Sequence, residues 1–239
     1  MFLAMDTVFD QCSVAILDAS GQVISNHTEK GKRQQTQQIL PMIDIALSES
    51  QLKLADIQAL IFNRGPGAFS GIRINTAVVQ ALSVAHDLPC VGVSSLQAIA
   101  QKAYQQYGLT EVYSALDARM QQVYFGHYKL QTQPMEELAK DPTSLAMEPV
   151  VLEGHESTEQ LLDYDSQTKL TIPVVGNGAA LLSLHKDQKL YEDSWPDATV
   201  IGQLGVIQFA AFGGTGATEA LPKYLRNQAW KTLKEQGKT

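Results

Sequence analysis

The chain has 239 residues, of which 44% are hydrophobic and 18% are charged, and its formal net charge is −7. This length allows a sizeable core, in one large domain or in two smaller lobes. The acidic balance argues against a protein that holds a nucleic-acid backbone unaided, because phosphates are neutralised by clustered Lys and Arg. The two cysteines, Cys12 and Cys90, are far apart and predict neither a disulfide framework nor a zinc site. We find no secretory signal and no apolar run long enough to span a bilayer, so we expect a cytoplasmic protein.

Five strand patterns occupy the first hundred residues. Residues 2–8, 12–18 and 22–28 are short β-rich runs, and the turn residues between the last two favour a hairpin, which predicts a three-stranded meander. Residues 57–63 and 88–95 have the apolar pattern of buried strands, and each leads into a helix. Together these patterns indicate one α/β lobe.

Two helices between these strands are apolar on more than one face. The first has a stripe that includes Ile39 and Ile43, with Met42 and Ile45 on a different face. The second, after the turn that ends near residue 71, is apolar on both sides. A helix that is apolar all round is buried all round, and in a lobe this small the outer covering is expected from another subunit.

The second half repeats the scheme. Residues 112–119 and 121–130 predict two strands joined by a polar turn, and 172–182 predict a strand, a glycine turn and a helix. A final helix is predicted over 201–212, whereas 131–170 show no clear period. The strand-rich openings of both halves predict two related α/β lobes. The basic run at the C-terminus, which starts with Lys223, is interpreted as a solvated tail.

The stretch RGPGAFSGIR, residues 64–73, lies between a strand and a helix, where glycine turns often hold phosphates. Its glycines, Gly65, Gly67 and Gly71, do not form GxGxxG, and the Lys-Ser/Thr of a P-loop is absent. Backbone N–H groups could still meet a phosphate at the helix start, with Ser70 as the N-cap. The alternative is a tight turn that lets backbone pack closely.

Three charged residues are candidates for ligand contacts. Asp6 ends the first strand and could orient a metal ion through water, but Val8 and Phe9 would obstruct a phosphate at the following turn. No Lys or Arg lies between residues 6 and 13 to meet its charge. Asp117 and Arg119 lie on the turn between two strands, where a ligand contact competes with an internal ion pair or a solvated turn.

Other catalytic patterns are missing from the sequence. The five histidines are scattered without metal-ligand spacing, and no nucleophile–base pairing is evident. The glycine turn at 176–180 could admit a nucleotide base or ribose, or it could be structural. The sequence therefore does not display the residues of an active site.

Six motifs in chain order carry a family resemblance: AMDT, QILPMI, RGPGAFSGIRI, LPCVGVSSLQAIA, LDARMQQVY and LPKYLR. Their order and spacing resemble the bacterial TsaB family, also called YeaZ, with a specific match up to about residue 130. That family is similar to the ASKHA group (actin, sugar kinase, Hsp70). One departure is Gln35, where the family usually has His before its Ser-Gln pair.

The resemblance implies a fold and a division of the chain. The fold is α/β, a two-lobed ASKHA (ribonuclease H-like) fold with mixed sheets flanked by helices. The N-terminal lobe is expected over 1–103, joined by the C-terminal segment 217–239. The C-terminal lobe is expected over 104–216.

The resemblance also implies a function. The family supplies a non-catalytic subunit for making threonylcarbamoyladenosine (t6A) beside the anticodon of tRNAs that read codons starting with adenine. It binds and activates TsaD together with TsaE. The chain alone is expected to form a homodimer, to reach tRNA only through the complex, and to have no intrinsic cofactor, metal or membrane contact. ATP is expected only in the complex with TsaD and TsaE.

The family's pairing surface is built from its first two helices, which are the two helices with several apolar faces. The residues carried over as a partner or dimer interface are Thr36, Ile39, Leu40, Met42, Ile43, Ile72, Thr76, Val79 and Ser83. The candidates for vestigial nucleotide or inter-subunit contacts are Asp6, Arg64, Gly65, Gly67, Asp117 and Arg119.

Two other functions stay open. An active ASKHA-type ATPase or small-molecule kinase is suggested by Asp6 and the glycine turns. A peptidase is suggested because relatives of this fold have been labelled glycoproteases, although neither a zinc motif nor a nucleophile constellation is present.

Overall fold

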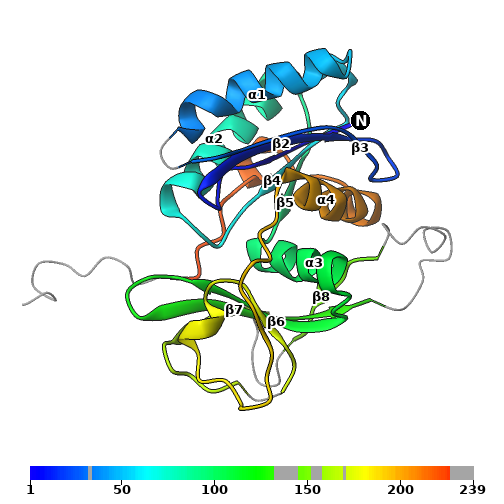
Figure 1. Ribbon diagram of the computed structural model, residues 1–239. Coiled ribbons are helices and arrows are strands. Elements are labelled where there is room, and N and C mark those ends of the chain that lie inside the picture. Colours follow the sequence, from blue (N-terminus) through cyan, green and yellow to red (C-terminus); the bar gives the residue numbers. More distant parts are fainter. Residues whose placement is uncertain (32–33, 132–144, 152–157, 169–170, 227–239) are drawn as a thin grey trace, which may run out of the picture.

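Two mixed β-sheets and the helices that cover them form the molecule (Figure 1). The computed structural model describes residues 1–31, 34–131, 145–151, 158–168 and 171–226. Helices α1 and α2 lie on the outer face of the first sheet, whereas α3 and α4 lie between the two sheets. The fold is therefore α/β, with mixed sheets flanked by helices, as the sequence predicts.

The first sheet has the strand order β3-β2-β1-β4-β5. Its strands are β1 (Phe2–Asp6), β2 (Gln11–Leu17), β3 (Val23–Lys30), β4 (Ala59–Asn63) and β5 (Cys90–Val93). Strand β1 is antiparallel to β2, and β2 is antiparallel to β3, which confirms the predicted meander. Strands β4 and β5 continue the sheet in parallel from β1.

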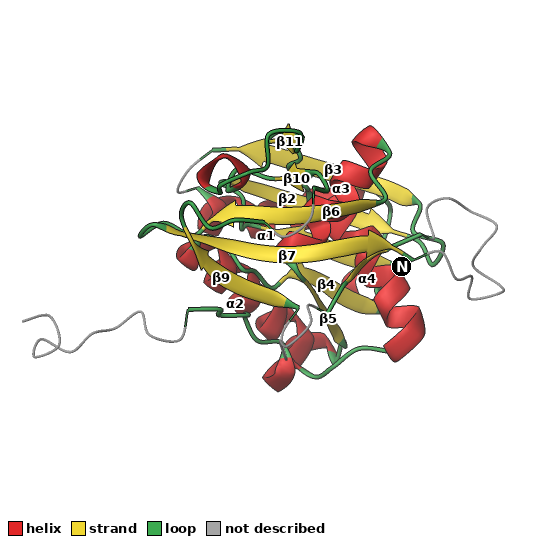
Figure 2. Cartoon of the chain, turned by 90° about the horizontal axis from the view of Figure 1, so that it is seen from below, coloured by secondary structure: helices red, strands yellow, loops and turns green. Residues whose placement is uncertain are grey.

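The second sheet repeats this topology (Figure 2). Its strands are β6 (Glu111–Asp117), β7 (Gln122–Leu130), β8 (Met147–Pro149), β9 (Glu159–Asp163), β10 (Val174–Val175) and β11 (Leu190–Tyr191). The central strand β6 is antiparallel to β7 and parallel to β10, as β1 is antiparallel to β2 and parallel to β4. The two lobes are thus related by the same order of strands around one central strand.

Four long helices pack on these sheets in the part of the chain that is described. Helices α1 (Gln35–Glu49) and α2 (Phe69–His86) cover one face of the first sheet, and α4 (Ala198–Phe212) covers its other face. Helix α3 (Ser95–Tyr107) packs on β6 and β7 of the second sheet. The described residues also include the short 3-10 helices η1 (Leu54–Asp56), η3 (Ala179–Leu181) and η4 (Ala217–Glu219).

The packing of two helices crosses the lobe boundary that the sequence suggests. Helix α3 starts within 1–103 but packs on the second sheet, and α4 lies within 104–216 but packs on the first. Helix α4 can approach so closely because Gly202 and Gly205 face the first sheet. An added Cβ would lie 2.3 Å from Leu17 at the former position and 2.2 Å from Ile61 at the latter.

The segment from 131 to 190 differs most from the sequence prediction. Strands β8, β9 and β11 are not predicted, and the helix predicted within 172–182 is only the single turn η3. Gly176 has a φ of +98°, and an added Cβ there would lie 2.4 Å from the carbonyl oxygen of Ala115. This glycine lets the chain turn tightly after β10, against β6. Much of the remaining stretch lies outside the described residues.

None of the helices in the described ranges combines the length and the apolar composition that crossing a bilayer requires.

Candidate functional site

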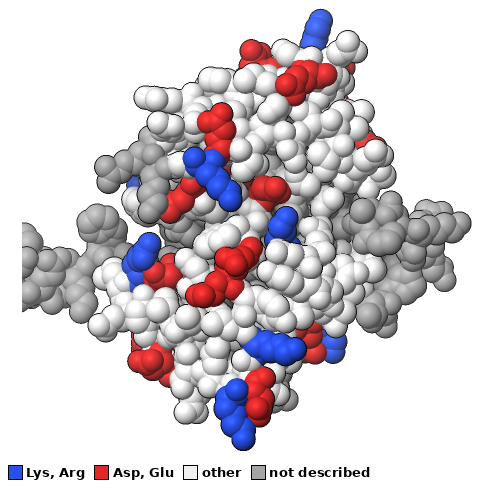
Figure 3. Space-filling model, in the orientation of Figure 1, with Lys and Arg blue, Asp and Glu red and all other residues white. Residues whose placement is uncertain are grey.

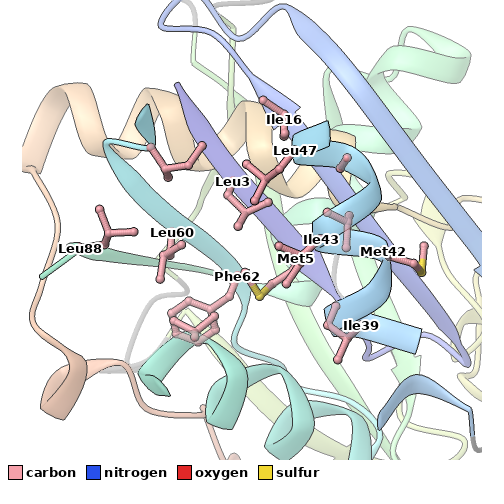
Figure 4. Packing of buried hydrophobic residues seen from close by; sticks show 14 of the residues in the cluster. Leu3, Met5, Ile16, Ile39, Met42, Ile43, Leu47, Leu60, Phe62 and Leu88 are labelled. Carbon is pink, nitrogen blue, oxygen red and sulfur yellow. The ribbon is translucent and has the colours of Figure 1, made fainter. Parts of the chain in front are cut away.

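The apolar stripe of α1 faces the protein's own sheet (Figure 4). Ile39, Met42 and Ile43 are at most 5% exposed, and they pack in one cluster with Leu3 and Met5 of β1. Met42, which helical periodicity placed away from the stripe, therefore belongs to the core. The reason is that a sheet covers a wide arc of a helix, wider than one narrow stripe.

Helix α2 also turns its predicted interface residues inward. Ile72, Thr76, Val79 and Ser83 are all buried, and the Ser83 hydroxyl donates a hydrogen bond to the carbonyl oxygen of Leu88 at 2.6 Å. Seven of the nine predicted interface residues thus lie in the chain's own core. Only Thr36 and Leu40 are exposed. Periodicity finds two apolar faces but does not say which one the sheet covers.

The outward side of α2 is also largely apolar, whereas the exposed residues of α1 include the apolar Leu40 and Ile45 among polar side chains such as Asp44. Leu40 is 55% and Val84 is 76% exposed, and Ile45, Ala77 and Ala81 are exposed as well. Over the 18 residues of α2, the only Lys, Arg, Asp or Glu is an arginine near its start. Over the face of the molecule seen in Figure 3, charged side chains are interspersed with a larger uncharged area. We refer to Leu40, Ile45, Ala77, Ala81 and Val84 as the outer helix face.

The glycine turn before α2 makes room for the turn that follows β1. An added Cβ at Gly71 would lie 2.1 Å from the carbonyl oxygen of Thr7, and one at Gly67 would lie 2.3 Å from the side chain of Val8. The Thr7 hydroxyl donates a hydrogen bond to the carbonyl oxygen of Gly71 at 2.7 Å. Close backbone packing, one of the two alternatives, is therefore what these glycines provide.

The start of α2 differs from the prediction. The helix begins at Phe69, and its N-cap residue is Ala68, without a side-chain cap. Ser70, the predicted N-cap, lies inside the first turn. Of the two preceding candidates, Arg64 is half-buried and Gly65 is buried, and neither lines the cleft described below.

Asp6 is completely buried behind the turn that follows β1. Its Oδ1 accepts hydrogen bonds from the Val8 backbone N–H and from Asn63 Nδ2, both at 2.9 Å, and its Oδ2 accepts one from Gln11 Nε2 at 3.3 Å. Burial raises the pKa of this carboxyl to about 6, although the three hydrogen bonds lower it. Asp6 does not line the cleft, so it acts as an acceptor that shapes the turn.

A cleft of about 870 Å³ lies between the two lobes. Its walls come from the turn after β1, the start of α2, the turn between β6 and β7, and the segment before the C-terminus. Of the predicted contact residues, Gly67, Asp117 and Arg119 line this cleft. The structure thus brings together residues from turns that are far apart in the sequence.

Asp117 and Arg119 pair with each other. Arg119 Nη1 lies 2.7 Å from Asp117 Oδ2, and the Arg119 backbone N–H donates to Oδ1 at 2.8 Å. The Tyr164 hydroxyl donates a further hydrogen bond to Oδ1 at 2.8 Å. The internal ion pair is therefore present, as one of the sequence alternatives states.

The segment before the C-terminus contacts both lobes, which the sequence interpretation as a solvated tail missed. Lys223 Nζ lies 3.0 Å from Glu159 Oε2 on β9, and the Lys223 backbone N–H donates to the Arg64 carbonyl oxygen at 2.8 Å. Arg226 donates to the carbonyl oxygen of Ala118 at 3.2 Å and to Gln122 Oε1 at 2.8 Å. The LPKYLR motif was the signal available in the sequence. The basic residues beyond 226 lie outside the described residues.

Comparison with known proteins finds relatives that match almost the whole chain. The family model described as "TsaD: tRNA N6-adenosine threonylcarbamoyltransferase" matches residues 22–230. The tRNA threonylcarbamoyladenosine biosynthesis protein TsaB of Escherichia coli K12 is 36% identical over 97% of both chains. Its namesake from Haemophilus influenzae is 33% identical over 97% of this chain and 96% of the other. The chain belongs to the TsaB family.

Solved structures show the same family fold. YeaZ from Pseudomonas aeruginosa superposes with a TM-score of 0.78 at 32% identity, over 94% of this chain and 99% of the other. A second Pseudomonas aeruginosa structure, described as an uncharacterized protein with similarity to peptidase YEAZ, has a TM-score of 0.80. The predicted TsaB resemblance and the two-lobed ASKHA fold are thus confirmed.

The individual TsaD protein that matches is similar over a shorter part of this chain than the family model is. A tRNA N6-adenosine threonylcarbamoyltransferase from Polynucleobacter necessarius is 35% identical, but over 69 residues, which are 29% of this chain and 19% of that protein. TsaB-family proteins, by contrast, match nearly from end to end.

Proposed function

We propose that this TsaB-family chain is a non-catalytic subunit for t6A formation in tRNAs that read codons starting with adenine. It acts in the cytoplasm by binding and activating TsaD together with TsaE. The observation that carries the proposal is the apolar outer helix face on a chain that matches proteins named for threonylcarbamoyladenosine biosynthesis over their whole length. Exposed apolar patches of this kind are typical of protein interfaces.

The surroundings of Asp6 support an accessory role. Three hydrogen bonds already occupy its carboxylate oxygens, and the Val8 side chain fills the space that Gly67 leaves open. A phosphate could not approach the backbone of this turn without displacing Val8. The chemistry of the transfer is therefore assigned to TsaD, and any ATP to the complex with TsaD and TsaE.

The outer helix face is the proposed contact for TsaD. The residues now proposed to contact TsaD are Leu40, Ile45, Ala77, Ala81 and Val84, because seven of the residues predicted from the sequence are buried within the chain. Small side chains on α2 would let a partner helix approach closely. The same patch would pair two copies of the chain by a two-fold axis when TsaD is absent, and tRNA would be met only through the assembled complex.

The test places a charge on this face. In Ala81→Glu, a carboxylate would be buried without a partner on binding, which we expect to weaken the complex with TsaD of the same organism at least tenfold. Ala211→Glu, at an exposed position near the end of α4, is the matched control and should bind like the wild type. Size-exclusion chromatography with light scattering measures the complex, and circular dichroism confirms that both variants are folded.

Two results would contradict the proposal. If the wild type and TsaD elute separately, with and without TsaE and ATP, the assigned function is wrong. If the complex forms and Ala81→Glu binds as tightly as Ala211→Glu, the function stands but the outer helix face is not its interface.

The cleft between the lobes favours one alternative, an ASKHA-type ATPase or small-molecule kinase. Its volume of about 870 Å³ is enough for a nucleotide-sized ligand. Calorimetry of the isolated chain with Mg-ATP decides this. A micromolar site with hydrolysis that is lost in Asp117→Ala, a substitution in the cleft lining, supports the alternative, whereas no heat of binding argues for the accessory role.

A further inference from the structure

The inter-lobe cleft has a local charge opposite in sign to the net charge of the whole chain. Its lining contains five basic and two acidic side chains, although the chain carries a net charge of −7. The basic residues are Lys30, Arg73, Arg119, Lys223 and Arg226, and the acidic ones are Asp10 and Asp117. Such local positive charge in an acidic protein attracts an anionic partner.

Part of this charge is not neutralised within the described residues. Arg119 and Lys223 form the ion pairs described above. Lys30 and Arg73 are exposed, and no ion pair with a described carboxylate involves them. Arg226 is held by neutral acceptors, the carbonyl oxygens of two residues and the amide of Gln122. Lys30 and Arg73 are therefore available to meet carboxylates from outside.

Exposed apolar side chains stand beside these cations. Phe69 is 52%, Met120 is 73% and Tyr224 is 45% exposed. The Arg73 guanidinium lies 3.7 Å from the centre of the Phe69 ring, and its Nε donates to the Tyr224 hydroxyl at 3.3 Å. Aromatic residues, Met and Arg are the types that are enriched in the centres of protein interfaces.

Met120 lies in a turn with a left-handed backbone that Arg226 stabilises. Arg119, Met120 and Gln121 have φ values of +58°, +55° and +60°, a left-handed conformation that L-residues with side chains disfavour. Arg226 stabilises this turn by donating to the carbonyl oxygens of Ala118 and Arg119. Strain of this kind persists where the surroundings over-determine the backbone, and it clusters at functional sites.

We infer that the cleft mouth binds an acidic segment of a partner protein. We define the mouth by the lining residues Lys30, Phe69, Arg73 and Tyr224, together with Met120, whose sulfur accepts a hydrogen bond from the lining residue Arg226 at 3.2 Å. Carboxylates of that segment pair with Lys30 and Arg73. An adjacent aromatic or aliphatic side chain packs on Phe69, Met120 and Tyr224. A small anion would leave these apolar side chains exposed, and the net negative charge of the chain disfavours RNA. This inference goes beyond the proposed function, because it adds a second binding surface that shares no residue with the outer helix face.

The experiment uses a random twelve-residue peptide library displayed on phage. Selection is made on the full chain and is followed by counter-selection on the double variant Lys30→Glu/Arg73→Glu, whose changed residues are both exposed. We expect the enriched peptides to carry Asp or Glu next to an aromatic or aliphatic residue. A synthetic consensus peptide is then titrated against the chain. The readout is the fluorescence of Trp195, which lines the cleft, in a Trp230→Phe background that leaves one tryptophan.

The expected dissociation constant rises at least tenfold in Arg73→Glu and about threefold in Met120→Ser. The matched control is Lys189→Glu, an exposed charge reversal away from the cleft, and it should not change binding.

Enriched peptides without an excess of acidic residues, or a consensus peptide that binds the double variant equally well, would overturn the inference. If inorganic phosphate or Mg-ATP displaces the consensus peptide completely and reverses its effect on Trp195 fluorescence, the site binds small anions instead. Self-association that Arg73→Glu abolishes would show that a second copy is the occupant.

Discussion

Asp6 and Asp117 occupy equivalent positions, at the ends of the central strands of two sheets with the same topology, but their surroundings differ. Asp6 is buried and tied by three hydrogen bonds, and the turn after it packs against Gly67, before α2, and Gly71, in the first turn of α2. Asp117 is partly exposed at the cleft, where it pairs with Arg119. The same strand order has therefore produced one closed turn and one open turn. Neighbouring elements, rather than topology, decide which turn can meet a ligand.

Gly71→Ala is the strongest way to break this contrast. The new methyl group would lie 2.1 Å from the Thr7 carbonyl oxygen, so the closed turn and α2 would have to separate. We expect a loss of about 3 kcal/mol in the free energy of unfolding, measured by urea denaturation. Gly31→Ala, where an added Cβ meets nothing within 4 Å, is the control and should change stability by less than about 0.5 kcal/mol. Equal effects of the two substitutions would mean that the close packing does not stabilise the turn.

The pH dependence of stability in the wild type and in Asp6→Asn tests whether the Asp6 carboxyl is held in its buried environment. The Asp6 pKa is raised to about 6 in the folded chain from 3.8. The folded state therefore holds the proton more tightly than the unfolded state does. The contribution of Asp6 to the free energy of unfolding therefore falls as pH rises from about 4 to about 6. A shift of this size corresponds to about 3 kcal/mol.

Urea denaturation from pH 4 to pH 7 measures this effect. The stability of the wild type relative to Asp6→Asn should fall by up to about 3 kcal/mol over that range. Asp44→Asn removes an exposed carboxylate of α1 and serves as the control. A difference between wild type and Asp6→Asn that stays constant with pH would show that Asp6 is not held in the buried, raised-pKa state.

Arg226→Ala tests the open turn and should have the smallest effect. It removes the hydrogen bonds that Arg226 donates to Ala118, Arg119 and Gln122 at the surface. We expect a loss of about 1 kcal/mol of stability and faster amide hydrogen exchange at residues 119–122. Arg226→Lys keeps the charge but not the forked geometry, and it should restore only part of the protection. Unchanged exchange in Arg226→Ala would mean that the left-handed turn maintains itself.

Much of the fold could be predicted because the strands of the first lobe and the long helices have strong local patterns. The meander at 2–28, the buried strand near 60 and the helix near 201–212 all follow from alternation, apolar runs and turn residues. Strands β11, with two residues, and β8, with three, are too short to produce such a pattern. Tertiary pairing with the neighbouring strands defines them.

The candidate site was less predictable than the fold. Gly67, Asp117 and Arg119 were singled out from the sequence and do line the cleft. The contribution of Lys223 and Arg226 was missed, because their partners are about 60 to 160 residues away in the chain. Long-range contacts of this kind leave no local periodicity.

The family, the two related α/β halves and the two helices with apolar residues on more than one face can all be predicted from the amino-acid pattern. Tertiary packing is needed to establish which face of those helices remains outside, which sheet contacts α3 and α4, and where the last described residues lie. The physical reason is that an amphipathic pattern specifies that a face must be buried but not what buries it. That choice depends on close approaches, such as those at Gly71, Gly202 and Gly205, which exist only once distant segments have met.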